Sequence, residues 1–131
     1  MLKDLSILIV DDDAGMRNVL AALLSAEGHL PVSAGNGTEA AEVMAREPVD
    51  LILTDILMPD KDGLELIKDV RGAHKRIPIV AFSGGGYRIG TRYCLQIAKA
   101  IGATTVISKP FDRQQLLSAI EDAMGQACGS R

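Results

Sequence analysis

Three carboxylates follow short apolar runs of the sequence. Asp11 and Asp12 come directly after Leu5 to Val10, and Asp55 comes directly after Val49 to Thr54. Taken alone, Asp55 is typical of a strand-end or capping aspartate. Carboxylates that gather closely raise one another's pKa unless a cation shares the site, and such oxygen ligands suit Mg²⁺. A carboxylate can also act as a nucleophile and form an aspartyl phosphate.

A hydroxyl and an ammonium group follow two further apolar runs. Ser83 comes directly after Ile77 to Phe82, and Lys109 follows Thr104 to Ile107 with one residue between. Phosphoryl transfer depends mainly on positioning and on neutralising charge, which a metal ion, a lysine and a hydroxyl can supply. If these residues meet in space, they form a candidate site for phosphoryl chemistry.

The residues meet only if the apolar runs are strands of one parallel sheet. Five such runs alternate with segments of helical periodicity, and Pro31 in the second run favours an edge strand. The expected strands are Leu5 to Val10, Leu30 to Ala34, Val49 to Thr54, Ile77 to Phe82 and Thr104 to Ile107. This alternation predicts an α/β fold, a doubly wound parallel sheet with helices on both faces and right-handed crossovers. Such folds bind ligands outside the carboxyl ends of their strands.

Local signals predict where several helices begin and end. We expect Asp13 to cap the first helix and Gly28 to stop it. Gly72 and Gly102 are expected to end two later helices. Two further helix starts have the spacing of a capping box, Asn36 with Glu39 and Asp112 with Gln115.

Length, charge and hydrophobicity limit the classes of protein to which the chain can belong. The 131 residues fit one domain, which we expect over residues 1–125 with a loose tail over 126–131. The net charge is −3 without a basic stripe, which argues against nucleic-acid binding. No apolar run is long enough to span a membrane, and no signal peptide or disulfide framework is evident. We therefore expect a cytoplasmic protein.

The motifs together resemble a known family, the receiver domain of two-component response regulators. The resemblance covers about residues 5–125 and rests on Val10-Asp11-Asp12, Asp55, Met58-Pro59, Asp62-Gly63, Ser83 and Lys109-Pro110-Phe111. It implies a flavodoxin-like sheet with strand order 2-1-3-4-5 and five helices. It also implies a stand-alone, chemotaxis-type receiver, which is a signalling switch and not an enzyme with a separate substrate.

The resemblance implies a role for each candidate site residue. Asp55 would be the phosphoacceptor, and a histidine kinase or histidine phosphotransfer protein would be the donor. Asp12 and Asp55 would ligate Mg²⁺ directly, Asp11 would act mainly through water, and Leu57 would add its backbone carbonyl. Asp13 is left to cap the helix, which agrees with its capping preference.

Ser83 and Lys109 would contact the phosphoryl oxygens. A cis peptide between Lys109 and Pro110, which the resemblance also implies, would direct the lysine inward. The sequence departs from the family at Val106, where an aromatic residue is common. The connection after Ser83 is also long and rich in glycine, from Gly84 to Gly90.

Two other functions compete with this interpretation. One is a receiver-like interaction module that is never phosphorylated, but neither the acidic positions nor the lysine is lost. The other is a metal-dependent phosphatase with Asp55 as its nucleophile. Such enzymes usually place a general acid two residues later, where this chain has Leu57. The kinase and the downstream partner are not evident from the sequence.

Overall fold

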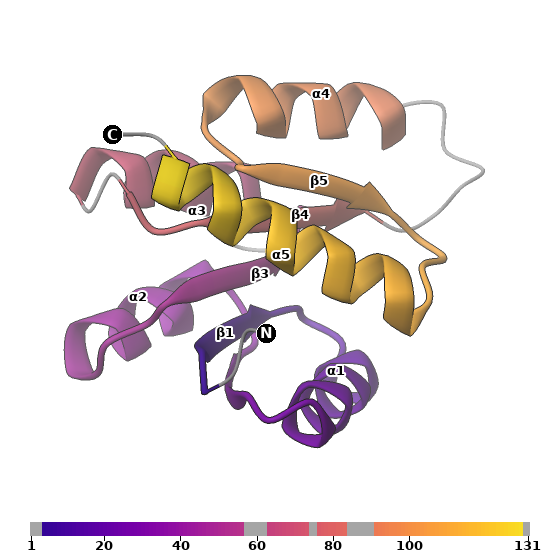
Figure 1. Ribbon diagram of the computed structural model, residues 1–131. Helices are drawn as coiled ribbons and strands as arrows, with labels where there is room; N and C mark the ends of the chain where they lie inside the picture. Colours follow the sequence, from indigo (N-terminus) through magenta and orange to yellow (C-terminus); the bar gives the residue numbers. More distant parts are fainter. Residues whose placement is uncertain (1–3, 57–62, 74–75, 84–90, 130–131) are drawn as a thin grey trace.

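Five strands and five helices alternate along the chain in the computed structural model, which describes residues 4–56, 63–73, 76–83 and 91–129 (Figure 1). The strands are β1 (Ser6–Val10), β2 (Leu30–Ala34), β3 (Leu51–Asp55), β4 (Ile79–Ser83) and β5 (Thr105–Ser108). The helices are α1 (Ala14–Ala26), α2 (Gly37–Arg46), α3 (Gly63–Ala73), α4 (Thr91–Ile101) and α5 (Arg113–Gly129).

The strands form one parallel sheet in the order β2-β1-β3-β4-β5, which confirms the predicted fold class. The central strands β3 and β4 are buried along their whole length, as the continuous apolar runs predicted. Pro31 lies in β2, at the edge of the sheet, where the missing N–H of proline is tolerated.

Two hydrophobic cores cover the two faces of the sheet. Alternate residues of a strand point to opposite faces, so that Leu8 and Val10 of β1 join one core while Ile7 and Ile9 join the other. The first core contains residues of α2, α3 and α4, and the second contains residues of α1 and α5. Because helices pack on both faces, the strand ends remain the place where polar side chains can gather.

Helix ends follow the sequence signals closely. Asp13 caps α1 by accepting hydrogen bonds from two backbone N–H groups, and Gly28 then adopts a φ of 89°. At α5, Asp112 and Gln115 exchange both bonds of a capping box, at 2.8 Å each. At α2 only half of the capping box forms. The N–H of Glu39 donates to Oδ1 of Asn36, but the carboxylate of Glu39 accepts from the N–H of Gly35 and not from that of Asn36.

Several boundaries differ from the prediction: the bounds of every strand except β2 are shifted by one or two residues, so that Ser83, expected after β4, ends it, and two helices run further than expected. Asp55 is the last residue of β3 and pairs with Phe82, whereas we expected it to follow the strand. Helix α3 continues through Gly72 to Ala73, and α5 continues to Gly129, where we expected a loose tail. The mobility of residues 126–131 stays a prediction. Among the described residues, no helix is both long and apolar enough to cross a membrane.

Candidate functional site

The residues singled out from the sequence gather at the carboxyl edge of the sheet. Asp11 follows β1, Asp55 ends β3, Ser83 ends β4 and Lys109 follows β5. Because β1, β3, β4 and β5 are neighbours in the parallel sheet, their ends lie at one edge. Asp12 joins them because it follows Asp11 directly.

Three carboxylates form an acidic cluster, which consists of Asp11, Asp12 and Asp55. One oxygen from each lies within 4.8 Å of the others. Asp11 and Asp55 are 1% and 7% exposed, while Asp12 is open to solvent. Like charges at this spacing repel, and burial of two of them reduces the screening by water. The cluster therefore favours a bound cation.

Asp11 is buried with only part of its carboxylate hydrogen-bonded. Its Oδ1 accepts a hydrogen bond from the N–H of Asp13 at 2.9 Å, but its buried Oδ2 has no hydrogen-bond partner among the described residues. Burial is the largest influence on the pKa of this carboxyl group and raises it, with a further contribution from the charges of Asp12 and Asp13. The bond from Asp13 and the charge of Lys109 act in the opposite direction.

Lys109 provides positive charge between two of the carboxylates. Its Nζ lies 3.8 Å from Oδ2 of Asp11 and 3.9 Å from Oδ2 of Asp55. The same Nζ stands 4.9 Å from the ring centroid of Phe82, which is fully buried. The Lys109–Pro110 peptide bond is cis, as the resemblance implied. One ammonium group does not balance three carboxylates, so the cluster keeps an excess of negative charge.

Ser83 completes the group of sequence-predicted residues that the structure describes. It is fully buried at the end of β4, and its carbonyl accepts a hydrogen bond from the backbone N–H of Lys109 at 2.9 Å. This bond joins the end of β4, which carries the Ser83 hydroxyl, to the residue that carries the ammonium group. Leu57 and residues 84–90, for which we also made predictions, lie outside the described residues.

Three contacts at the site were not predicted from the sequence. Arg17 reaches back from α1, and its Nη1 donates to the carbonyl oxygen of Asp11 at 2.7 Å. Phe82 supplies the ring beneath Lys109 and packs edge-on against Phe111, with centroids 5.6 Å apart. Phe82 belongs to an apolar strand run, and nothing in that run distinguishes it from an ordinary core residue.

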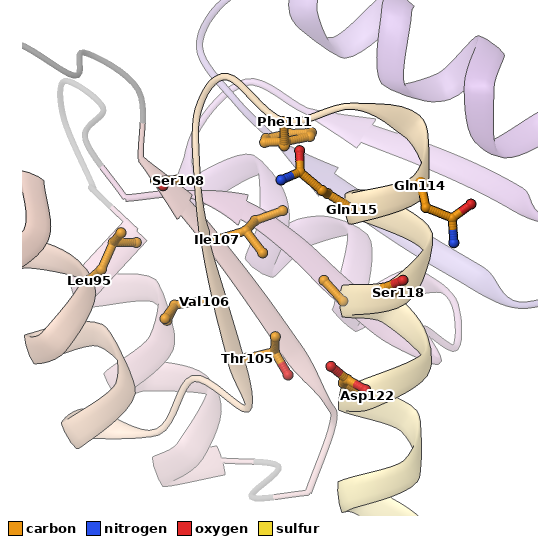
Figure 2. A pocket seen from close by; sticks show the side chains of 11 residues that line it. Leu95, Thr105, Val106, Ile107, Ser108, Phe111, Gln114, Gln115, Ser118 and Asp122 are labelled. Carbon is orange, nitrogen blue, oxygen red and sulfur yellow. The ribbon is translucent and has the colours of Figure 1, made fainter.

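A groove of about 470 Å³ lies beside the site, between α4, β5 and α5 (Figure 2). Val106 and Ile107 of β5 line it, with Leu95 of α4 on one side and Gln114 and Ser118 of α5 on the other. Val106 also packs against the core on the α4 side of the sheet. The groove is mostly apolar and follows directly along the strand that leads to Lys109.

A family model and the relatives found by sequence comparison agree on one protein family. Residues 7–121 match the response regulator receiver domain. The chain is 32% identical to the transcriptional regulatory protein GlrR of Escherichia coli (strain K12) over 130 residues, 95% of this chain and 27% of GlrR. It is also 32% identical to sporulation initiation phosphotransferase F of Bacillus subtilis (strain 168) over 115 residues, 88% of this chain and 90% of that protein.

The fold is shared with solved structures as well. The receiver domain of NtrX from Brucella abortus superposes with a TM-score of 0.83 at 30% identity, over 91% of this chain and 98% of that domain. The chain thus spans about a quarter of the regulator GlrR but nearly all of the phosphotransferase and of the isolated NtrX domain.

Proposed function

The chain belongs to the response regulator receiver domain family, and on that basis we propose that Asp55 accepts a phosphoryl group from a histidine kinase or a histidine phosphotransfer protein. The observation that carries the proposal is the combination at the sheet edge. Three carboxylates share one cluster, and Lys109 lies within 4 Å of two of them. Phosphoryl transfer needs charge neutralisation at such a site more than it needs covalent machinery.

The acidic cluster fits a divalent cation. The buried Oδ2 of Asp11 lacks a hydrogen-bond partner among the described residues, which is costly unless a cation compensates it. Asp12 and Asp55 would hold Mg²⁺ directly and Asp11 mainly through water, and the carbonyl of Leu57 stays a predicted ligand outside the described residues. When bound, the ion would neutralise charge on the phosphoryl oxygens.

Three residues of this chain have the other roles in phosphoryl transfer. An Asp55 carboxylate oxygen attacks phosphorus and forms the new P–O bond. In a phosphohistidine donor the phosphorus–nitrogen bond breaks, and the electron pair stays on the imidazole nitrogen. Lys109 lies close enough to Asp55 to bind a transferred phosphoryl oxygen, and the Ser83 hydroxyl is proposed to donate to another.

Phosphorylation is proposed to switch a partner-binding surface. Ser83 leads directly into residues 84–90, so an inward shift of its hydroxyl would move that connection. The surface would comprise Tyr87, Arg88, Arg92 and the neighbouring face of β5, whose groove Figure 2 shows. The first two residues lie outside the described part of the chain. A phosphoryl group would act here by favouring one of two states of this segment.

Phosphorylation with a small-molecule donor tests the proposal. The protein is incubated with a small acyl phosphate and Mg²⁺, and the intact mass is measured. We expect one added phosphoryl group that is lost at alkaline pH and absent from Asp55→Asn. Asp112→Asn is the matched control, because asparagine also caps helices and Asp112 lies at the start of α5, outside the cluster. Equal labelling of Asp55→Asn and wild type would refute the assignment.

A further inference from the structure

Thr54 is a buried polar residue that the proposed chemistry does not use. It lies in β3 directly before Asp55 and is fully buried. Its neighbours on the same face of the strand, Ile52 and Ile56, are fully buried aliphatic residues of the first core. Because alternate strand residues point to opposite faces, the Thr54 hydroxyl is directed into this core, away from the side of the sheet on which Leu53 packs. A valine would fill the same space without a polar group.

The hydroxyl of Thr54 holds the backbone of the residue that follows. Its Oγ1 donates to the carbonyl oxygen of Asp55 at 2.9 Å. On the other side of the same peptide unit, the N–H of Ile56 donates to the carbonyl of Phe82 at 2.9 Å. The peptide between Asp55 and Ile56 is thus bonded at both its oxygen and its N–H, which fixes its plane.

Gly63, the first residue of α3, closes this arrangement. Its N–H donates to the carbonyl of Ile56 at 2.9 Å. A Cβ placed on Gly63 would stand 2.1 Å from the carbonyl oxygen of Asp55 and 2.6 Å from the Cα of Ile56. The start of α3 therefore packs backbone to backbone on the peptide that Thr54 holds. A rotation of that peptide has no free space on this side.

We propose that Thr54 is a positioning residue for the reaction at Asp55. The inference rests on the proposed phosphoacceptor function. The two hydrogen bonds hold the backbone from which the Asp55 side chain extends, and the carboxylate lies 3.9 Å from Lys109. A displacement of about 1 Å in a reacting group can lower the rate about 100-fold. Thr54 acts through this peptide and does not touch the phosphoryl group.

The alternative explanation is that Thr54 only fills the core. In that case the maximal rate of phosphorylation would follow folding stability. In the positioning role the rate and the stability change independently, because the hydroxyl holds the Asp55 carbonyl while the methyl group packs in the core. Thr54→Val keeps the shape and removes the hydroxyl, whereas Thr54→Ser keeps the hydroxyl and removes the methyl group. Thr54→Ala compared with Thr54→Ser provides a second pair that differs in the hydroxyl alone.

The test measures phosphorylation of these variants by a small acyl phosphate at saturating Mg²⁺, over a range of donor concentrations, together with urea unfolding. We expect Thr54→Val to lower the maximal rate about tenfold without changing the donor concentration at half-maximal rate. Thr54→Ser should stay within about twofold of wild type although it unfolds at lower urea. The ratio between Thr54→Ser and Thr54→Ala should again be about tenfold, which keeps the test valid if Thr54→Val does not fold.

Each outcome has one meaning. A wild-type rate in Thr54→Val, or rates that follow unfolding midpoints across the set, would overturn the positioning role while leaving Asp55 as the phosphoacceptor. Absence of phosphorylation in the wild-type protein itself would instead refute the proposed function. A matched stability control is Ile52→Val, which alters the same face of β3 and should change the unfolding midpoint but not the maximal rate.

Discussion

Replacement of Asp11 by asparagine should stabilise the metal-free protein at neutral pH. The Asp11 side chain is 1% exposed, and its Oδ2 has no hydrogen-bond partner among the described residues. Asparagine keeps an Oδ1 that can accept from the N–H of Asp13, so the one good bond of this side chain survives. What is lost is a buried negative charge beside two others.

The magnitude follows from the difference between a charged and a neutral buried group, because the amide nitrogen of asparagine takes the place of Oδ2 without gaining a partner among the described residues. A buried polar group without a partner costs about 1–3 kcal/mol, and more if it is charged, while the attraction of Lys109 at 3.8 Å offsets part of the cost of the charge. We therefore expect Asp11→Asn to raise the free energy of unfolding by about 1–3 kcal/mol. In urea this gain corresponds to a midpoint about 1 M higher.

The pH dependence has a defined sign. Burial raises the pKa of Asp11 in the folded protein above its ordinary value of 3.8. The folded state then binds this proton more tightly than the unfolded state does, so the wild-type protein gains stability as the pH falls through the raised pKa. The advantage of Asp11→Asn should be full above the raised pKa and should disappear below the ordinary one.

Urea unfolding in the presence of EDTA, at neutral pH and in steps down to about pH 4, measures both effects. Asp12→Asn is the control, because it removes the same charge from an exposed member of the cluster and should change stability little. The comparison between variants cancels groups that titrate equally in both proteins. A less stable Asp11→Asn at neutral pH, or an advantage that does not shrink with falling pH, would refute the reasoning.

Three further predictions address the helix start, the metal and the switch. Gly63→Ala should lower the free energy of unfolding by more than about 2 kcal/mol in thermal or urea melts, because its Cβ would overlap the Asp55 backbone. Gly72→Ala in the same helix is the control, because its Cβ meets open space, and it should be neutral or slightly stabilising. Asp12→Ala should weaken Mg²⁺ binding at least about tenfold by calorimetry, and equal affinities would show that Asp12 is not a ligand. Hydrogen exchange with a stable phosphoryl mimic and Mg²⁺ should change protection in residues 84–92 with little effect at Val106, and a change confined to another surface would contradict the proposed route.

The sequence was sufficient to predict which residues meet, because the fold is regular. In a parallel sheet, an apolar run followed by a polar residue places that residue at one edge, which is how Asp55, Ser83 and Lys109 were found. Spacing alone also predicted the reciprocal bonds between Asp112 and Gln115. These features depend on residues close in the chain or on the ends of strands.

Features that depend on packing between distant segments could not be predicted. Phe82 looks like any core residue until the fold brings Lys109 over its ring. Thr54 reads as a β-branched strand residue, and its bond to Asp55 depends on which rotamer the surrounding core allows. Gly63 carries a loop signal in the sequence, but its backbone contact with Asp55 appears only once α3 is packed on β3.

Identification of the modified residue tests the central claim most directly. The protein is phosphorylated with a small acyl phosphate and Mg²⁺ and then reduced with borohydride, which converts an aspartyl phosphate to homoserine. Peptide mass spectrometry locates the converted residue. The account predicts conversion at Asp55 and at neither Asp11 nor Asp12. Conversion at either of those two residues, or at none in a protein that has gained a phosphoryl group, would contradict it.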